Sequence, residues 1–213
     1  MDILNNRARK IKVCGMRDTA NILEIAALEP DYMGFIFYPL SSRYAGEVDA
    51  EIVRELPSSI KKTGVFVNAD LATIAKWGTV LQLDAVQLHG NESPEFCLKL
   101  KENGIEVIKA FGIHADFEFK SLENYLQVVD YFLFDTSTAQ HGGSGKVFDW
   151  ELLLQNNTDI PFFLSGGIDL EQLDTIAQIN DSRLYAVDLN SKFELSPGIK
   201  DYSKLKKIFK GRL

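Results

Sequence analysis

A thiol and an ammonium group stand two residues apart in the short apolar segment Ile11-Lys12-Val13-Cys14-Gly15. If this segment is a β-strand, side chains alternate between its two faces, so Lys12 and Cys14 share one face. A lone cysteine is commonly a small core hydrophobe, and Cys14 could be no more than that. A thiolate also accepts protons, and a nearby cation lowers the pKa of a thiol. Cys14 is therefore a candidate site residue, with Lys12 as the candidate cation.

A carboxyl group and an imidazole lie at the C-terminal ends of two other apolar runs. Asp135 follows Phe132-Leu133-Phe134, and His89 ends the run 85–89. Apolar surroundings raise the pKa of a carboxyl by desolvation, so Asp135 is a candidate for a raised pKa. Each residue also has a simpler interpretation, Asp135 as a helix or loop cap and His89 as a hydrogen-bonded loop histidine.

Two kinds of element alternate along the chain and must position these groups. Each short apolar run is followed by a stretch with helix signals, and successive apolar runs are spaced roughly 20–30 residues apart. The predicted strands are 11–15, 32–37, 63–67, 85–89, 106–112, 131–135, 161–165 and 184–189. Strands that alternate with helices form right-handed units and a parallel sheet. Eight such units in about 200 residues are the lower size limit of the (β/α)₈ barrel.

Helix signals follow each predicted strand. The clearest are Ser93 as N-cap, Pro94 in the first turn and Gly104 just after the end. Other predicted helices begin at Asp18 or Thr19, near Asp49, at Asp70, near Asp149 and Trp150, and at Asp169. A further helix is predicted across 122–129, and an amphipathic helix with Leu205, Ile208 and Phe209 on its apolar face ends the chain. An open doubly wound sheet is the rival fold, but no G-x-G-x-x-G motif follows the first strand. We predict an α/β fold, one (β/α)₈ TIM barrel domain over residues 1–213.

Active sites of such barrels lie at the C-terminal ends of the strands. Those ends, with the loops that follow them, collect the reactive side-chain types of this chain: Cys14, Arg43, Gln87, His89, Asp135, Ser165 and Asp188. Packing alone does not explain such a collection at one end. Arg43 could still be a surface charge, and we expect His114 and His141 to be structural or exposed.

Two loops carry a phosphate signal. Gly166-Gly167 lies between a strand and a helix start, where backbone N–H groups and a helix N-terminus receive anions. Asn190-Ser191 follows the last strand, and this fold places phosphate at its seventh and eighth loops. The glycine-rich segment 142–146 does not match a P-loop and is predicted to be a mobile cover over the site.

Composition narrows the class of protein. The 213 residues include 23 Lys and Arg against 30 Asp and Glu, a net charge of −7 that argues against a nucleic-acid partner. No apolar run approaches membrane-spanning length, and Cys14 and Cys97 form no disulfide framework. No His, Asp or Glu spacing suggests a metal site. We expect a cytoplasmic protein with a small-molecule partner and no membrane partner, either a monomer or a homodimer.

With these residues assembled, the chain resembles the phosphoribosylanthranilate isomerases of tryptophan biosynthesis. The matching stretches appear in the family's order over nearly the whole chain: Lys12-Val13-Cys14-Gly15, Gly34-Phe35-Ile36-Phe37, Ser41-Ser42-Arg43, Val86-Gln87-Leu88-His89-Gly90, Phe134-Asp135-Thr136, Gly142-Gly143-Ser144-Gly145, Phe148-Asp149-Trp150, Leu164-Ser165-Gly166-Gly167, Asp188-Leu189-Asn190-Ser191 and Pro197-Gly198-Ile199-Lys200-Asp201. No single stretch would carry the resemblance.

The resemblance implies an Amadori rearrangement of a phosphoribosyl anthranilate, with no cofactor and no metal. It implies Asp135 as the general acid that opens the ribose ring and Cys14 as the general base that removes the C2 proton. Arg43 and Asp188 would hold the anthranilate and ribose portions. Gln87 and His89 would line the pocket, and phosphate would bind at Gly166, Gly167, Asn190 and Ser191.

One stretch departs from the family pattern. Residues 190–194 read Asn-Ser-Lys-Phe-Glu where the family usually has Ser-Ser-Gly-Val-Glu. Glycine permits positive φ and a close backbone approach, which Lys192 does less easily. We expect Lys192 either to change the loop geometry or to contribute charge directly.

Two alternatives remain. Another phosphosugar barrel fits less well, since a histidine-pathway isomerase would carry an aspartate where Cys14 stands, and a pentulose-phosphate epimerase needs metal-binding His and Asp residues. A catalytically silent barrel that binds phosphosugars is the other; intact Cys14 and Asp135 argue against it.

Overall fold

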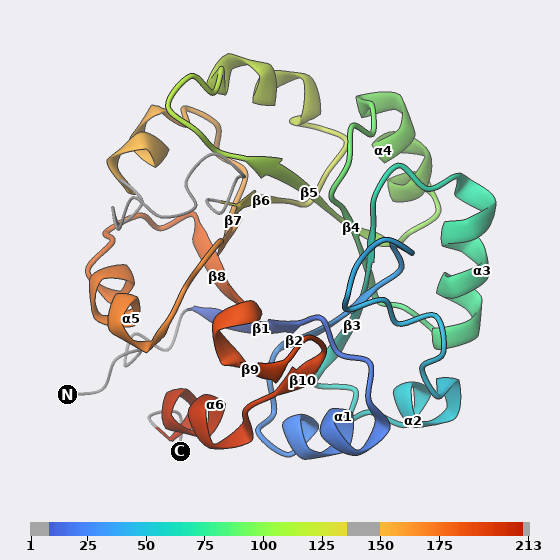
Figure 1. Cartoon of the computed structure of the whole chain (residues 1–213). Coiled ribbons are helices and arrows are strands. Elements are labelled where there is room, and N and C mark those ends of the chain that lie inside the picture. Colours follow the sequence, from blue (N-terminus) through green and yellow to red (C-terminus); the bar gives the residue numbers. More distant parts are fainter. Residues whose placement is uncertain (1–8, 136–149, 211–213) are drawn as a thin grey trace.

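The computed structural model describes residues 9–135 and 150–210. Within these residues, eight parallel strands close into a barrel in which β1 pairs with both β2 and β8 (Figure 1). The strands are β1 (Lys10–Cys14), β2 (Tyr32–Ile36), β3 (Lys61–Phe66), β4 (Ala85–Leu88), β5 (Glu106–Gly112), β6 (Tyr131–Asp135), β7 (Phe162–Ser165) and β8 (Leu184–Leu189). The predicted (β/α)₈ barrel is confirmed.

Helices surround the barrel (Figure 1). They are α1 (Thr19–Ala26), α2 (Ala50–Arg54), α3 (Leu71–Leu81), α4 (Pro94–Glu102), α5 (Leu170–Ala177) and α6 (Tyr202–Phe209). The predicted N-caps Asp18, Asp70, Ser93 and Asp169 each accept a backbone N–H bond, and Gly104 ends α4 with a φ of 78°. In the part of the chain described, no helix is long and apolar enough to cross a membrane.

Two connections differ from the prediction. The helix expected over 122–129 is instead the 3₁₀-helix η1 (Phe119–Tyr125), and the one expected near Asp149 and Trp150 is the 3₁₀-helix η2 (Trp150–Gln155). Glu118, which precedes η1, forms no capping hydrogen bond through its side chain. Each of the six α-helices named above begins with a side-chain cap, and η1 lacks one.

The side chains of the strands divide into two layers. Residues such as Ile11, Val13 and Phe132 pack outward beneath the helices, whereas Leu133 and Phe163 fill the barrel interior. Because side chains alternate along a strand, Lys12 and Cys14 face the interior, as predicted.

The N-terminal end of the barrel is closed by aromatic rings. The Tyr32 hydroxyl group donates to Glu106 Oε1 at 3.0 Å and lies 3.2 Å from the Tyr185 hydroxyl group. Tyr131 stacks on Tyr185 with ring centroids 4.5 Å apart, and Phe163 packs edge-on against Tyr32. This closure leaves the opposite end of the interior for polar side chains.

A small hairpin follows β8 and was not predicted. The 3₁₀-helix η3 (Ser191–Phe193) leads into β9 (Glu194–Ser196), which pairs with β10 (Ile199–Lys200). Asn21 of α1 ties the hairpin to the barrel, since its amide donates to the Lys200 carbonyl group at 3.0 Å and accepts from the Lys200 N–H at 2.7 Å. The hairpin therefore has a fixed position beside α1.

Candidate active site

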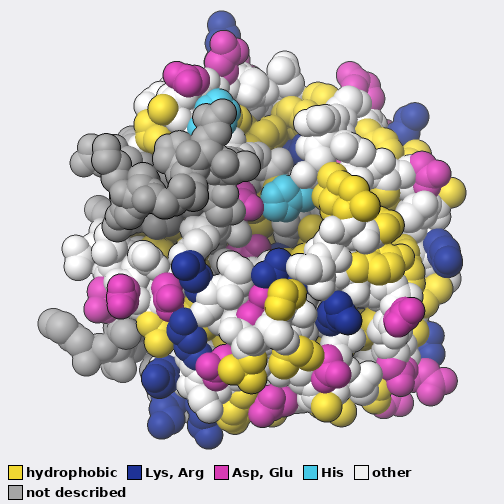
Figure 2. Space-filling model, in the orientation of Figure 1, with side chains coloured by type: hydrophobic (Ala, Val, Ile, Leu, Met, Phe, Trp, Pro, Cys, Tyr) yellow, Lys and Arg dark blue, Asp and Glu magenta, His cyan; other side chains and the backbone are white. Residues whose placement is uncertain are grey.

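The C-terminal ends of the strands bring the predicted catalytic and pocket residues to one face. Cys14 ends β1, Asp135 ends β6, and His89 directly follows β4. Seen from this face, a histidine lies near the centre with acidic side chains beside it and Lys or Arg side chains close by (Figure 2). The face thus offers groups that donate, accept and stabilise charge.

Cys14 lies in a buried, charged surrounding. Lys12 Nζ, one pleat below it, contacts Asp188 Oδ1 at 3.0 Å and Oδ2 at 3.1 Å, with side-chain exposures of 0% for Lys12 and 5% for Asp188. Ser165 Oγ is 3.4 Å from Asp188 Oδ2. Burial alone would lower the pKa of Lys12, but Asp188 and Cys14 outweigh burial and raise it. Lys12 is therefore a cation that already has an anionic partner.

The pKa of the Cys14 thiol differs from the prediction. Burial raises the pKa of Cys14 above its usual value; Lys12 and Lys200 oppose that shift, and Asp188 adds to it. The expectation that Lys12 gives Cys14 a depressed pKa is wrong. The physical reason is that desolvation disfavours the thiolate and Asp188 offsets the charge of Lys12.

The neighbouring strand leaves room for the thiol only because it carries a glycine there. Gly34 of β2 is the register partner of Cys14. A Cβ added at Gly34 would lie 2.7 Å from Cys14 Sγ and 3.2 Å from Cys14 Cα. Real Cβ atoms do not approach so closely, so Gly34 sets the space that the sulfur occupies.

His89 connects Gln87 with Asp135. His89 Nε2 lies 3.5 Å from Asp135 Oδ2, and Gln87 Nε2 lies 3.1 Å from His89 Nδ1. A neutral His89 that accepts at Nδ1 carries its proton at Nε2, facing the carboxylate. Gln87 Oε1 is buried, and no other described residue provides it with a hydrogen bond. Gln87 therefore offers an acceptor inside the barrel.

The apolar setting expected for Asp135 is only partly present. Phe132 and Phe134 pack in the outer layer, and Leu133 alone of the three faces the interior. The reason is strand alternation, which turns residues 132 and 134 away from the face of residue 135. The Asp135 side chain remains 18% exposed at the mouth of the barrel.

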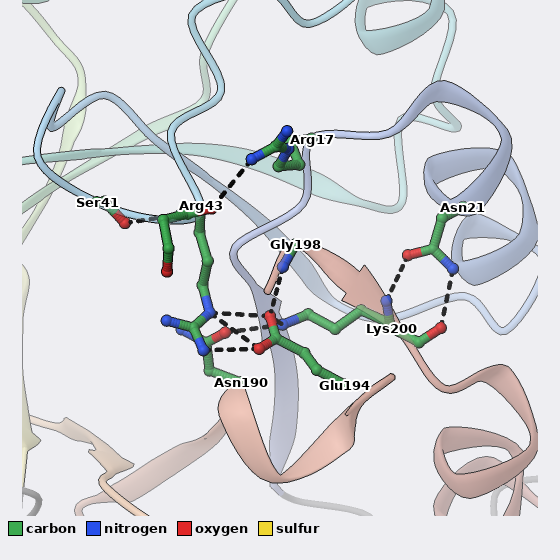
Figure 3. A network of polar contacts seen from close by, with 9 residues as sticks. Arg17, Asn21, Ser41, Arg43, Asn190, Glu194, Gly198 and Lys200 are labelled. Carbon is green, nitrogen blue, oxygen red and sulfur yellow. Dashed lines mark hydrogen bonds and ion pairs between the residues drawn. The ribbon is translucent and has the colours of Figure 1, made fainter. Parts of the chain in front are cut away.

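Arg43 is held by a network of polar groups (Figure 3). Its Nε donates to Glu194 at 2.9 and 3.0 Å, and its Nη2 donates to Glu194 Oε2 at 2.7 Å. Lys200 Nζ donates to Glu194 Oε1 and to Asn190 Oδ1, both at 2.7 Å. Burial alone would raise the pKa of Glu194, but Arg43 and Lys200 outweigh burial and lower it. Arg43 is thus a fixed cation at the mouth rather than a loose surface charge.

The two predicted phosphate loops are brought together. Gly166 and Gly167 have φ values of 102° and 62°, which only glycine adopts readily. Lys204 of α6 spans the loops, contacting Asp169 at 2.8 Å and donating to the Lys192 carbonyl group at 2.6 Å. Backbone donors of both loops therefore share one part of the rim.

Two details of the second phosphate loop differ from the expectation. The Asn190 side chain turns toward Lys200 (Figure 3), while Ser191 is exposed at the start of η3. Lys192 is not among the described residues with positive φ. The change from glycine therefore imposes no left-handed strain at that position.

Glu194 and Lys200 are the residues that the sequence did not single out as functional. Lys200 belongs to a stretch used for the family resemblance and Glu194 to the stretch that departs from it. The signal available was a Glu and a Lys on either side of Pro197-Gly198. The predicted cover over 142–146 and His141 lie outside the described residues. Among the residues that are described, no three His, Cys, Asp or Glu side chains form a group that could hold a metal ion.

Comparison with known proteins identifies relatives of this chain. Residues 11–211 match the family model described as N-(5'-phosphoribosyl)anthranilate (PRA) isomerase. A protein of that name from Parabacteroides distasonis is 46% identical over 198 residues, which cover 92% of this chain and 90% of the relative. Its counterpart from Thermotoga maritima is 37% identical over 203 residues, covering 94% and 97% of the two chains.

Solved structures of such isomerases have the same fold as this chain. Phosphoribosyl anthranilate isomerase from Thermotoga maritima has a TM-score of 0.81 at 37% identity, covering 95% of this chain and 98% of that one. Another structure, of an isomerase in complex with reduced 1-(o-carboxyphenylamino)-1-deoxyribulose 5-phosphate, has a TM-score of 0.77 at 33% identity, covering 95% and 97%. With the matched motifs spread over the barrel described above, the chain belongs to the N-(5'-phosphoribosyl)anthranilate isomerase family.

Proposed function

We propose that this enzyme converts N-(5'-phosphoribosyl)anthranilate into 1-(2-carboxyphenylamino)-1-deoxyribulose 5-phosphate, an Amadori rearrangement in tryptophan biosynthesis. The observation that carries the proposal is the placement of Cys14 and Asp135 at the C-terminal ends of β1 and β6, at the mouth of one barrel. A base and an acid at that end are what a proton transfer between neighbouring carbons requires.

Asp135 acts first, as the general acid. Its carboxylic proton goes to the ring oxygen of the ribose while the bond between C1 and that oxygen breaks. The nitrogen lone pair then forms the C1=N bond of a protonated Schiff base. His89, whose Nε2 lies 3.5 Å from Asp135 Oδ2, holds the carboxyl group at the mouth of the barrel.

Cys14 acts second, as the general base. Its thiolate takes the proton from C2, and the electron pair of that bond forms C1=C2 and neutralises the Schiff base. The resulting enol becomes a ketone when C1 gains a proton and the 2-hydroxyl group loses one. Atoms and electrons balance without an oxidant or reductant, so the chemistry itself calls for no redox cofactor.

The raised pKa of Cys14 fits this order of steps. In the free protein, burial favours the neutral thiol. The protonated Schiff base brings a positive charge next to the sulfur, and a nearby opposite charge favours the ionised form of a thiol. The first step would thus favour release of the thiol proton to solvent, which leaves the thiolate needed in the second step.

The remaining site residues would hold the carboxylate, the ribose hydroxyl groups and the phosphate of the substrate. We assign the anthranilate carboxylate to Arg43 and the ribose hydroxyl groups to Asp188, Gln87 and His89. The phosphate would bind to the backbone of Gly166, Gly167, Asn190 and Ser191, in the loops that precede α5 and follow β8.

The proposal also covers the domain organisation, the cellular location and the assembly of the protein. We propose that the chain acts as one domain, in agreement with a family match over residues 11–211. Two free cysteines suit a reducing cytoplasm. A homodimer is a possible assembly beside the monomer, since the Thermotoga maritima isomerase has been described as dimeric.

The direct test is turnover of freshly prepared phosphoribosylanthranilate, followed by the decay of anthranilate fluorescence. We expect decay far faster than the blank, with the deoxyribulose product identified by mass and chromatography. Binding of the reduced product analogue without any turnover would instead identify a silent binding barrel and refute the proposed activity.

A further inference from the structure

We infer that Lys200 is a positioning residue for Arg43: it compensates the charge of Glu194 and so leaves the Arg43 guanidinium able to attract the substrate carboxylate. The inference rests on the proposed function, because it assumes an anthranilate carboxylate at Arg43. It assigns a role to a buried lysine that the reaction steps do not use.

The contact geometry places Glu194 between two cations. Arg43 donates to it through Nε and Nη2, and Lys200 donates from the other side at 2.7 Å (Figure 3). The Gly198 N–H adds a fourth donor at 3.1 Å. The side-chain exposures are 4% for Glu194 and 0% for Lys200, so water does little to screen these two charges.

The charge balance explains why a second cation is needed. Arg43 and Glu194 alone would form a neutral pair, and a guanidinium neutralised by a carboxylate attracts a further anion weakly. Lys200 gives the three residues a net charge of +1. Burial lowers the pKa of Lys200, and Glu194 opposes that shift. The surplus charge is then available at Arg43, whose side chain is 23% exposed.

The guanidinium is also oriented by this contact. Arg43 binds Glu194 through Nε and Nη2, while Nη1 points away from Glu194 (Figure 3). A guanidinium has donors on more than one edge, and carboxylates bind such edges with defined geometry. The Nη1 edge is therefore the one presented to a ligand.

The network lies beside the catalytic strand. A Cβ added at Gly15, which follows Cys14, would lie 2.8 Å from both Arg43 Cδ and Asn190 Oδ1. The side-chain amide of Asn21 holds Lys200 in turn through two hydrogen bonds to the Lys200 backbone. Its position is thus set by α1 and the hairpin, so Arg43 is aligned relative to Cys14 by the fold itself.

The test uses two stable probes, reduced 1-(2-carboxyphenylamino)-1-deoxyribulose 5-phosphate and the same compound without the carboxylate. Calorimetry gives the ratio of the two dissociation constants, which measures how strongly the protein prefers the carboxylate. We expect Lys200→Met to reduce that ratio about tenfold, the loss of one favourable charge interaction. The exposed Lys207→Met, with the same change in net charge, should leave the ratio unchanged.

The double variant Lys200→Met with Glu194→Gln separates charge from structure. It removes both buried charges and leaves Arg43 positive, so we expect it to restore the carboxylate preference even if Lys200→Met alone does not fold. A double variant without that preference would overturn the inference. So would a folded Lys200→Met variant whose ratio of dissociation constants equals that of wild type, or one that binds both probes more weakly by the same factor. Wild-type protein that binds neither probe would refute the proposed function instead.

Discussion

At the scale of the residue, the two cysteines show that burial alone does not make a catalytic thiol. Burial raises the pKa of both, to about 11 for Cys97. Cys97 lies on the buried face of α4, in the outer layer, whereas Cys14 faces the interior beside Lys12 and Asp188. Because Lys109 gives Cys97 a nearby cation too, the two thiols differ in what each sulfur can reach.

The raised pKa of Cys14 predicts slow labelling by iodoacetamide near neutral pH. Only the thiolate reacts, and below the pKa its fraction increases about tenfold for each pH unit. The labelling rate of the peptide containing Cys14, measured by mass spectrometry, should therefore increase steadily from pH 6 to pH 8. A rate that is already independent of pH at pH 7 would show a depressed pKa and contradict this account.

The space that Gly34 leaves for the sulfur gives a second prediction. In Gly34→Ala the new Cβ must displace Cys14 Sγ, and misplacing a catalytic group by about 1 Å can cost on the order of 100-fold in rate. We expect kcat/KM to decrease by about 10- to 100-fold. Gly78→Ala is the matched control, because nothing lies within 4 Å of the added Cβ and alanine favours the helix. Wild-type kcat/KM in Gly34→Ala would contradict the prediction.

At the scale of the element, the strands that close the barrel are joined by a buried ion pair. Lys12 of β1 and Asp188 of β8 are register partners, and their side chains contact each other inside the barrel. The same pair borders Cys14. One interaction therefore serves both the closure of the fold and the electrostatics of the site.

Breaking this pair should be costly. Lys12→Met leaves the Asp188 carboxylate buried without its cation, which typically costs about 3–5 kcal/mol of unfolding free energy. Urea unfolding measures the loss. The double variant Lys12→Met with Asp188→Leu should recover most of it, because no buried charge is left unpaired. A loss below about 1 kcal/mol in the single variant would show that Asp188 finds another partner or becomes protonated at little cost.

At the scale of the whole molecule, the two ends of the barrel have separate tasks. The N-terminal end is closed by Tyr32, Tyr131 and Tyr185, and the C-terminal end carries the thiol, the carboxyl group and the phosphate loops. Such a division is the general pattern of this fold. Stability can therefore be perturbed at the N-terminal end without a change in the chemistry at the other end.

Tyr32→Phe tests that division. The change removes a buried hydroxyl group that bonds to Glu106 and Tyr185, and a lost hydrogen bond of this kind costs about 1–2 kcal/mol. We expect a lower unfolding free energy with kcat/KM within about twofold of wild type. A large loss of activity in a variant of unchanged stability would show that the two ends are coupled.

Much of the fold could be predicted because its signals are local. The apolar runs and the caps at Asp70, Ser93 and Asp169 lie within or next to the elements they define. The electrostatics could not be predicted in the same way. Lys12 meets Asp188 across 176 residues, and Arg43 meets Glu194 across 151, so these pairs exist only after the barrel has closed.

The most direct test of the central claim is a single-turnover measurement of phosphoribosylanthranilate conversion by wild type, Cys14→Ser and Asp135→Asn. The affinity for the reduced product analogue is measured in parallel, so that chemistry is separated from binding. We predict that both variants bind the analogue nearly as wild type does and lose at least about 100-fold in rate, the usual contribution of a general acid or base. A variant that keeps the wild-type rate would contradict the role given to that residue.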